Sequence, residues 1–269
     1  MGVTDDQRNR EMNAAAWDLR TAAHLASPFY AIDAFKAGEQ SLRPPELALV
    51  GDPAGKRLLH LQCHFGLDTL SWARLGAEVT GVDISPASIA AARDIAAELG
   101  LDATFICEDV QSLGEPEEHF DLVISSYGVV CWLSSLPAWA GTVARSLRPG
   151  GRFVMVEFHP ILEVLHPGKV SGTGRYFGVG EPAAHFSTGT YADPSAPISY
   201  WERRWQHTVA DVTSALTEAG LALRDFQEYP YCSYRLCEEL EVFEDGVWTA
   251  ADVEGLIPYM YSLVAVAPG

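Results

Sequence analysis

Two aspartates follow strand-like segments of the chain and have the chemistry to bind the sugar and base of a nucleotide. Asp83 follows the apolar stretch 77–82, and Asp109 follows the stretch 102–107. A carboxylate after a second strand suits a ribose, because it accepts hydrogen bonds from both hydroxyls. A carboxylate after the third strand can accept from an adenine amino group, while the N–H of Val110 donates to the ring. Capping of the following helix or turn is the alternative role of each aspartate.

The elements that must position these residues alternate along the middle of the chain. Apolar runs predict strands at 58–61, 77–82, 102–107, 120–125 and 152–158, and helices are predicted at 67–75, 86–99 and 136–147, the last closed by a turn over 148–151. This alternation predicts an α/β fold with a doubly wound parallel sheet. Ligands bind such sheets at the carboxyl ends of the strands, so the residues directly after each strand are the candidates for function.

The flanking segments predict a cap and an insertion. Residues 5–25 and 28–37 are expected to be helical, so residues 1–50 are interpreted as an N-terminal helical cap. Residues 51–158 and 208–269 would form the core, with a helix at 208–219 and strands at 221–229 and 259–267. The stretch 159–207 is rich in glycine and aromatic residues and lacks periodicity, so it is interpreted as an inserted lid with short hairpins. Its aromatic residues indicate either a planar or apolar acceptor pocket or a small core within the lid.

Three segments in order resemble one enzyme family. Residues 60–85 (HLQCHFGLDTLSWARLGAEVTGVDIS), 120–127 (FDLVISSY) and 147–157 (LRPGGRFVMVE) resemble the cofactor loop, fourth strand and fifth-strand turn of class I (Rossmann-like) S-adenosylmethionine-dependent methyltransferases. The resemblance covers about residues 55–160. It implies a seven-stranded, mostly parallel sheet whose one antiparallel strand is 259–267, and S-adenosyl-L-methionine as the cofactor.

The resemblance also implies roles for single residues. Asp83, with Ile84 beside it, would hold the ribose, and Asp109 with Val110 would hold the adenine. Trp17 and Tyr30 would close the crevice from the N-terminal side. The residues expected against the methionine part are Gln62, Cys63, His64, Gly66, Ser125 and Ser126.

The cofactor loop departs from the common family pattern of an acid followed by three alternating glycines. His60 replaces the acid, Gln62 and His64 replace two glycines, and only Gly66 remains. Because side chains at Gln62 and His64 need backbone angles that non-glycine residues accept, the loop is expected to approach the cofactor differently. The loop sequence Leu-Gln-Cys-His-Phe-Gly is similar to that of a subgroup of bacterial small-molecule methyltransferases.

Methyl transfer from a sulfonium is an in-line displacement, so alignment matters most and a base is needed only where the acceptor carries a proton. His159, directly after the fifth predicted strand, is the best-placed base, and His64 is a second candidate. Tyr127, after the fourth strand, could orient an acceptor. The alternatives are a structural role for His159 in its His-Pro turn and a packed loop position for His64.

Composition narrows the class of partner. The net charge is −18, with 18 basic residues against 36 acidic ones and no basic patch, so no nucleic acid partner is expected. The five cysteines form no C-x-x-C pair, which indicates free thiols, no metal site and a cytoplasmic protein. No apolar run of about 18 residues is present, so no membrane span is expected.

Three functions remain after these exclusions. The favoured one is methyl transfer to an O or N atom of a small-molecule acceptor, planar or aromatic. The alternatives are a non-catalytic S-adenosylmethionine-binding or regulatory protein and a protein methyltransferase. A nicotinamide-dependent oxidoreductase would need G-x-G-x-x-G in the first loop, which is absent.

Overall fold

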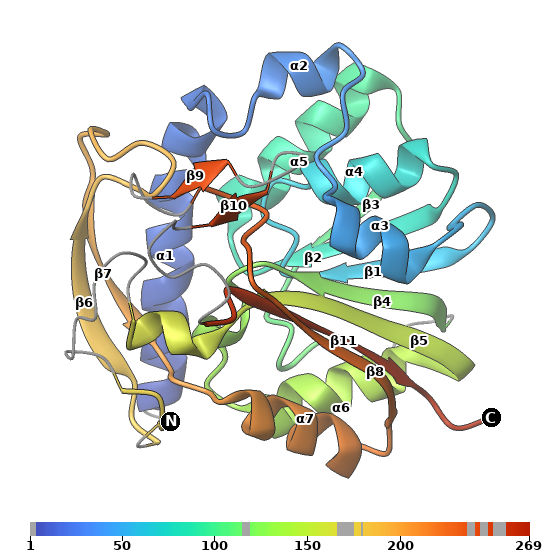
Figure 1. The fold of residues 1–269 in the computed structure, drawn as a ribbon. Coiled ribbons are helices and arrows are strands. Elements are labelled where there is room, and N and C mark those ends of the chain that lie inside the picture. The colour runs from blue at the N-terminus through green and yellow to red at the C-terminus, as the bar shows by residue number, and fades with distance from the viewer. Residues whose placement is uncertain are drawn as a thin grey trace.

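A seven-stranded sheet forms the centre of the computed structural model, which describes residues 4–114, 119–165, 175–178, 180–235, 240–242, 247–249 and 257–269 (Figure 1). In spatial order its strands are β3 (Thr104–Cys107), β2 (Glu78–Asp83), β1 (Arg57–Leu61), β4 (Phe120–Ser126), β5 (Leu147–Phe158), β11 (Met260–Val266) and β8 (Ala222–Tyr229). β11 runs antiparallel to both of its neighbours, and the other six strands of this sheet all point the same way. The predicted fold class and the position of the antiparallel strand are therefore confirmed.

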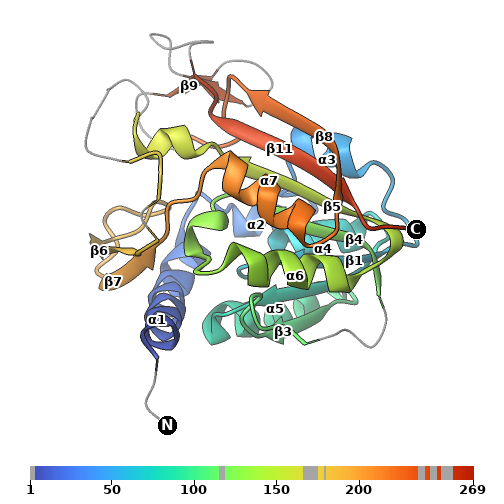
Figure 2. The same cartoon turned by 90° about the horizontal axis from the view of Figure 1, so that it is seen from below.

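Helices cover both faces of this sheet. On one face lie α3 (Pro44–Val50), α4 (Leu67–Arg74) and α5 (Pro86–Leu99), and on the other lie α6 (Leu136–Ser146) and α7 (Val209–Glu218). Figure 2 shows α6 and α7 side by side. The chain winds outward from β1 in one direction and from β4 in the other, so the switch point of the sheet lies between these two strands.

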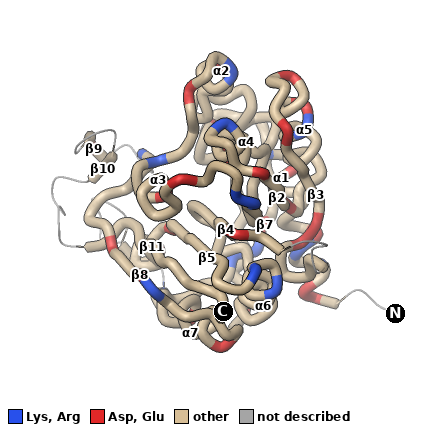
Figure 3. The backbone as a smooth tube through the Cα atoms, turned by 90° about the vertical axis from the view of Figure 1, so that its right-hand side faces the viewer, with Lys and Arg blue, Asp and Glu red and all other residues tan. Residues whose placement is uncertain are grey.

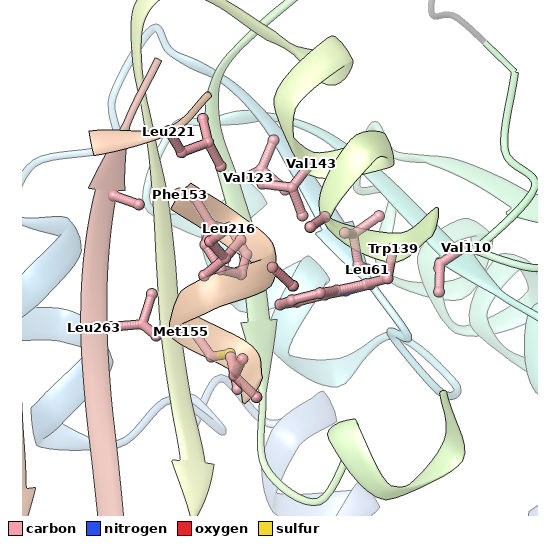
Figure 4. Packing of buried hydrophobic residues seen from close by; sticks show 14 of the residues in the cluster. Leu61, Val110, Val123, Trp139, Val143, Phe153, Met155, Leu216, Leu221 and Leu263 are labelled. Atoms are coloured by element: carbon pink, nitrogen blue, oxygen red, sulfur yellow. The ribbon is translucent and has the colours of Figure 1, made fainter. Parts of the chain in front are cut away.

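The alternation of side chains along each strand builds a separate core on each face. Val123, Phe153 and Met155 face α6 and α7, where they pack with Trp139 and Leu216 (Figure 4). The residues next to them in the strands pack on the opposite side with α3 and α4; they include Leu122, Ile124 and Val154. Strands β4 and β5 are thus apolar on both faces, as buried parallel strands must be.

The longest helix, α1 (Asp5–Ala26), lies between the sheet domain and a hairpin of β6 (Ala183–Thr188) and β7 (Ser199–Arg204); both views show α1 beside this hairpin (Figures 1 and 2). The Asn13 side chain donates to the carbonyl of Arg203 and accepts from its N–H, each at 2.8 Å. Asp18 accepts from the Ser85 hydroxyl at 2.5 Å and from the Ala87 N–H at 2.9 Å, where α5 begins. The α1 helix therefore ties the predicted lid to the sheet domain.

Smaller elements complete the described chain. They are α2 (Ile32–Lys36), the 3₁₀ turns η1 (Val130–Trp132) and η2 (Pro160–Glu163), and the strand pair β9 (Glu241–Val242) and β10 (Trp248–Thr249). Thr208 and Asp211 form a capping box at the start of α7, the helix predicted over 208–219. The turn predicted over 148–151 lies within β5, which begins at Leu147: Phe120 pairs with Leu147 and Leu122 already with Arg152, so residues 148–151 bulge from the ladder with β4, and Gly150 has φ +73°.

The structure shows where the basic residues lie and the state of three cysteines. Basic residues are scattered over several elements, as Figure 3 shows. Cys63, Cys107 and Cys131 carry free thiols, and Cys237 lies outside the described residues. Within the described ranges, no helix is both long and apolar enough to cross a bilayer.

The Trp139 side chain tests the packing of α6 on the sheet. It is 0% exposed and belongs to the same cluster as Phe153. Trp139→Ala is expected to lower the free energy of unfolding by about 3–5 kcal/mol, because it leaves a cavity in a closed core. Leu75→Ala, at a position that is 38% exposed, serves as the control in the same chemical denaturation experiment. A loss at position 139 no larger than in the control would contradict this packing.

Candidate active site

A cavity of about 640 Å³ opens at the carboxyl ends of β1 to β5, with α1 and α2 on one side. The predicted site residues that line it are Trp17, Tyr30, Gln62, Cys63, His64, Gly66, Asp83, Ile84, Asp109, Val110, Ser126, Tyr127 and His159. Ser125 does not line it: the residue is fully buried, and the alternation of β4 turns its side chain to the opposite face from that of Ser126.

The loop from β1 to α4 keeps a glycine-like backbone without the glycines. Gln62 has φ 58° and His64 has φ 52°, both in the left-handed region. The expectation that these two residues would take ordinary backbone angles is therefore wrong. Gly66 has φ +79°, and a Cβ there would lie 2.7 Å from the Phe105 ring, so this remaining glycine is required by packing as well. Close packing and the hydrogen bonds of the Asp83 carboxylate hold the loop in this shape.

Left-handed backbone is concentrated around the cavity. The non-glycine residues with positive φ among the described ones are Ala31, Gln62, His64 and Tyr127, and all four line this cavity. Such conformations cost of order 1–3 kcal/mol each and persist where the surroundings enforce them, commonly at functional sites. The strain therefore marks the cavity as the candidate active site.

Asp83 holds the loop in place. One carboxylate oxygen accepts the His64 N–H at 2.8 Å and the other accepts the Ser85 N–H at 2.9 Å. Burial raises the pKa of Asp83 to about 6, and these two N–H donors oppose that shift. Each oxygen keeps a lone pair for a further donor from the cavity.

Two oxygen atoms in the cavity wall are buried and lack a hydrogen-bond partner among the described residues. They are Asp109 Oδ2 and Gln62 Oε1. The other oxygen of Asp109 accepts from the Gln111 N–H at 2.9 Å, and Arg10 Nε of α1 lies 3.3 Å from Oδ2. Arg10 offsets the charge of Asp109 Oδ2, but both oxygens can still accept a hydrogen bond, which indicates a ligand that donates hydrogen bonds here.

His64 belongs to a buried polar chain rather than to open solvent. Its Nε2 lies 2.8 Å from His24 Nδ1, and its Nδ1 lies 3.0 Å from the Ser88 hydroxyl, which in turn lies 2.7 Å from that of Thr21. Burial lowers the pKa of His64 far below the usual value, and nearby His24 and Arg20 lower it further. Both ring nitrogens are engaged, so the structure favours the packed loop position over a base.

His159 is likewise committed to its turn. Its Nδ1 accepts the Ile161 N–H at 3.1 Å, so the proton lies on Nε2, which is 3.1 Å from Glu228. Burial lowers the pKa of His159, while the charge of Glu228 opposes the shift. Because both ring nitrogens already have partners, His159 has no free lone pair with which to take a proton from a methyl acceptor. The structure therefore favours the structural role of this histidine.

The third catalytic candidate, Tyr127, has a proton acceptor behind it. Its hydroxyl donates to the carboxyl group of Glu46 on α3. Glu46 is 1% exposed, and burial together with the charge of Asp68 raises its pKa to about 8. Sequence reasoning missed Glu46, because nothing in the order of residues shows that α3 packs against the end of β4.

A second buried carboxylate, Glu157, anchors the segment after β4. Its oxygens accept the N–H groups of Gly128, Val129, Val130 and Phe158, at 2.7 Å for Val129 and 3.0 Å for Val130. Burial raises the pKa of Glu157, although these four donors oppose the shift. Glu157 and the segment 128–130 both line the cavity, so Glu157 fixes the shape of this part of its wall.

A cation and an anion face the same end of the cavity near α3 and α4. Arg43 and Asp68 both line it, and the Arg43 guanidinium lies 4.7 Å from the centroid of the Tyr234 ring. Arg43 Nε is buried without a hydrogen-bond partner among the described residues.

His60, at the position where the resembling family has an acid, is buried between Thr69 at 2.9 Å and Ser126 at 3.3 Å. Burial lowers the pKa of His60, so it brings no charge to replace that acid.

The segment after β7 roofs the cavity. The Trp205 N–H donates to the carbonyl of Cys131 at 2.8 Å, and His207 Nε2 lies 2.7 Å from the carbonyl of Leu133. Of the lid aromatics, Tyr191 and Trp205 line the cavity, although Tyr191 is also 57% exposed, whereas Phe186 and Trp201 do not line it and are exposed by 57% and 54%. The lid therefore contributes some aromatic residues to the cavity and leaves others on the surface.

Comparison with known proteins is consistent with this geometry. Residues 58–151 match the family model of the methyltransferase domain. A ubiquinone biosynthesis O-methyltransferase of Methylobacterium nodulans is 28% identical over 174 residues, which are 62% of this chain and 60% of that enzyme. The chain thus matches less than two thirds of the length of this curated relative.

Solved structures share the fold. An S-adenosylmethionine-dependent methyltransferase from Mesorhizobium loti superposes with a TM-score of 0.55 at 21% identity, covering 83% of this chain and 96% of that one. A glycopeptide N-methyltransferase in complex with S-adenosylmethionine gives a TM-score of 0.55 at 19% identity, covering 82% and 85%. The seven-stranded sheet is therefore the class I methyltransferase fold.

Glu157→Gln tests the anchor of the cavity wall. Each carboxylate oxygen of Glu157 accepts two backbone N–H groups, and in the variant the amide NH₂ would replace one of these oxygens. About two charge-assisted hydrogen bonds would be lost, so the free energy of unfolding is expected to fall by about 3 kcal/mol. Urea denaturation measures the change, with Glu218→Gln on the exposed face of α7 as control. Equal stability of the two variants would contradict the anchoring role.

Proposed function

We propose that this chain is an S-adenosylmethionine-dependent methyltransferase that transfers a methyl group to an oxygen or nitrogen atom of a small molecule. The observation that carries the proposal is a pair of carboxylates at the ends of adjacent strands in one cavity, the buried Asp83 and the largely buried Asp109. The match to the methyltransferase domain supports it. The Leu-Gln-Cys-His-Phe-Gly loop supports a place among bacterial small-molecule enzymes with that loop, and the free thiols fit the reducing cytoplasm.

The unpartnered groups of the cavity fit the adenosyl end of this cofactor. Asp83 has free lone pairs for two ribose hydroxyls, and Asp109 Oδ2, which forms an ion pair with Arg10 but makes no hydrogen bond among the described residues, can accept from an adenine amino group. Trp17, whose ring centroid lies 5.1 Å from that of His64, would close the cleft from α1. Donor and acceptor types therefore match at each position that the sequence assigned to the nucleoside.

The charged groups near α3 fit the amino-acid end. An α-amino acid carries one ammonium and one carboxylate, and the cavity offers Asp68 and Arg43 close to the loop. The Arg43 guanidinium has a buried unpartnered Nε, so a ligand carboxylate would satisfy it. We assign Arg43 and Asp68 to the methionine part, since His60 cannot supply the negative charge that the family places there.

Bound S-adenosylmethionine supplies an electrophilic methyl group, and the residues of the chain align the acceptor and receive its proton. Because the departing thioether needs no proton, no acid has to stand behind it. The proton of an O–H or N–H acceptor can pass to Tyr127 while the Tyr127 hydroxyl proton moves to Glu46, so Glu46 ends protonated. This step needs the ionised form of Glu46, and because the pKa of Glu46 is about 8, that form becomes dominant only as the pH rises through 8.

The roofed cavity favours a small molecule over a protein substrate. Trp205 and His207 are hydrogen-bonded to Cys131 and Leu133 in the cavity wall, and a volume of about 640 Å³ is in the range of small-molecule sites. The relatives named for quinone biosynthesis support an O-methylated acceptor with a ring. A non-catalytic S-adenosylmethionine-binding protein is the second candidate, and the buried Tyr127–Glu46 pair weighs against it.

Asp83→Asn tests the cofactor assignment. Loss of a charged acceptor for the ribose is expected to cost about 2 kcal/mol, or roughly 30-fold in affinity for S-adenosylhomocysteine, measured by isothermal titration calorimetry. Asp102→Asn, at an exposed acid just before β3, should bind as the wild type does. No binding to the wild-type protein, or equal affinity in all three proteins, would overturn the proposal.

The affinity for S-adenosylhomocysteine should also depend on pH through Asp83. The ionised carboxylate accepts both ribose hydroxyls, and with a pKa of about 6 it is ionised above pH 7 and largely protonated at pH 5. Affinity is therefore expected to be constant above pH 7 and to fall about tenfold by pH 5. Titrations at several pH values measure this. Asp83→Asn should show a flat profile, and an equally steep decline in that variant would assign the effect to another group.

Tyr127→Phe tests the proton path. The variant is expected to lower kcat by about 100-fold or more, with unchanged affinity for S-adenosylhomocysteine, because only the transfer of the acceptor proton is affected. Formation of S-adenosylhomocysteine with an acceptor from a screen of phenols and amines gives the rate. Tyr229→Phe, whose hydroxyl lies 3.0 Å from that of Ser262 outside the cavity, is the control. Full turnover by Tyr127→Phe would exclude this route.

A further inference from the structure

Arg204, the last residue of β7, projects from the lid into the cavity wall. Its guanidinium carbon lies 5.3 Å from the centroid of the Trp132 ring, and its Nη2 lies 2.6 Å from Glu202. Its Nε has no hydrogen-bond partner among the described residues. The guanidinium is thus held in place on one side and has donors left on the other.

The carboxylate that holds Arg204 is already neutralised by a second arginine. Glu202 is 0% exposed and forms an ion pair with Arg20 of α1, which is 3% exposed. Arg20 also donates to the Tyr200 hydroxyl at 2.8 Å and stacks on Trp17, its guanidinium carbon 4.6 Å from the ring centroid. Two guanidinium groups therefore share one buried carboxylate, and one positive charge remains at the cavity.

Other charged groups near Arg204 do not cancel that charge. Glu163 of η2 lines the cavity and attracts Arg204, but it is solvent-exposed and no ion pair between the two is seen in the described part of the chain. Cys131 is a neutral thiol, since burial raises its pKa to about 12. An isolated positive charge in a partly buried wall is costly unless a ligand supplies the counter-charge.

The strand geometry singles out Arg204 from its neighbour. Side chains alternate along β7, so Arg203 points away from the face that carries Glu202 and Arg204, and it does not line the cavity. The backbone of Arg203 is held by Asn13, and that of Trp205 by Cys131. Both ends of this short segment are fixed, so the Arg204 side chain is presented in one place.

We propose that Arg204 binds a carboxylate group of the methyl acceptor, so that the acceptor is a planar aromatic acid. The inference rests on the proposed methyltransferase function and names the substrate class of the same cavity. A guanidinium matches a carboxylate with two parallel hydrogen bonds. The ring of such an acid would pack against Trp132 or Trp205, which line the same wall.

Matched acids and amides test this inference. With S-adenosylhomocysteine saturating, the binding of hydroxybenzoate and hydroxycinnamate isomers is compared with that of their carboxamides by calorimetry. At least one acid is expected to bind the wild-type protein about tenfold or more tightly than its amide, since an ion-paired hydrogen bond is lost in the amide. Arg204→Gln should abolish that preference, Arg204→Lys should keep part of it, and Arg203→Gln should keep all of it.

The controls separate failure of this inference from failure of the proposed function. Each variant is first titrated with S-adenosylhomocysteine and melted to confirm its fold. If the wild-type protein does not bind S-adenosylhomocysteine, the methyltransferase function itself fails. If it does, the inference is overturned when no acid binds, when acids and amides bind equally, when aminomethyl analogues bind best, or when the preference survives Arg204→Gln.

Discussion

The carboxylate of Asp83 is the interaction on which the rest of the site depends. It accepts N–H groups from both the cofactor loop and the start of α5, and so it fixes a loop whose residues Gln62 and His64 lie in the left-handed region. Without these hydrogen bonds, the energetic cost of left-handed backbone angles at two non-glycine residues would be poorly offset. The same carboxylate faces the cavity with lone pairs to spare. Loop shape and ligand chemistry are thus set by one side chain.

The α1 helix extends this constraint to the lid. Its Asp18 caps α5 directly after Asp83, its His24 contacts the cofactor loop through His64, and its Arg20 is buried in an ion pair with the lid residue Glu202. Residues of one helix therefore touch the start of α5, the loop after β1 and the β6–β7 hairpin. Such an arrangement links cofactor and acceptor positions through rigid contacts, which suits a reaction whose main demand is alignment.

The sequence predicts the sheet and the position of two acids in the cavity because both follow from local order: a strand, then an acid, then a helix. Asp83 and Asp109 are found this way, as is the antiparallel strand β11. What it misses depends on packing between distant segments, such as Glu46 behind Tyr127. The loop angles were predicted wrongly, because propensity gives way to tertiary hydrogen bonds. His159 lies where the sequence predicts, after β5. Its two ring nitrogens, however, contact Ile161 and Glu228, and the sequence does not show that Glu228 lies beside it.

A crystal structure with S-adenosylhomocysteine bound tests the central claim most directly. The account predicts both ribose hydroxyls within hydrogen-bond distance of Asp83, the adenine amino group at Asp109 Oδ2, and the left-handed angles of Gln62 and His64 unchanged. A nucleoside that lies elsewhere, or a ribose that turns away from Asp83 toward another residue, would contradict it.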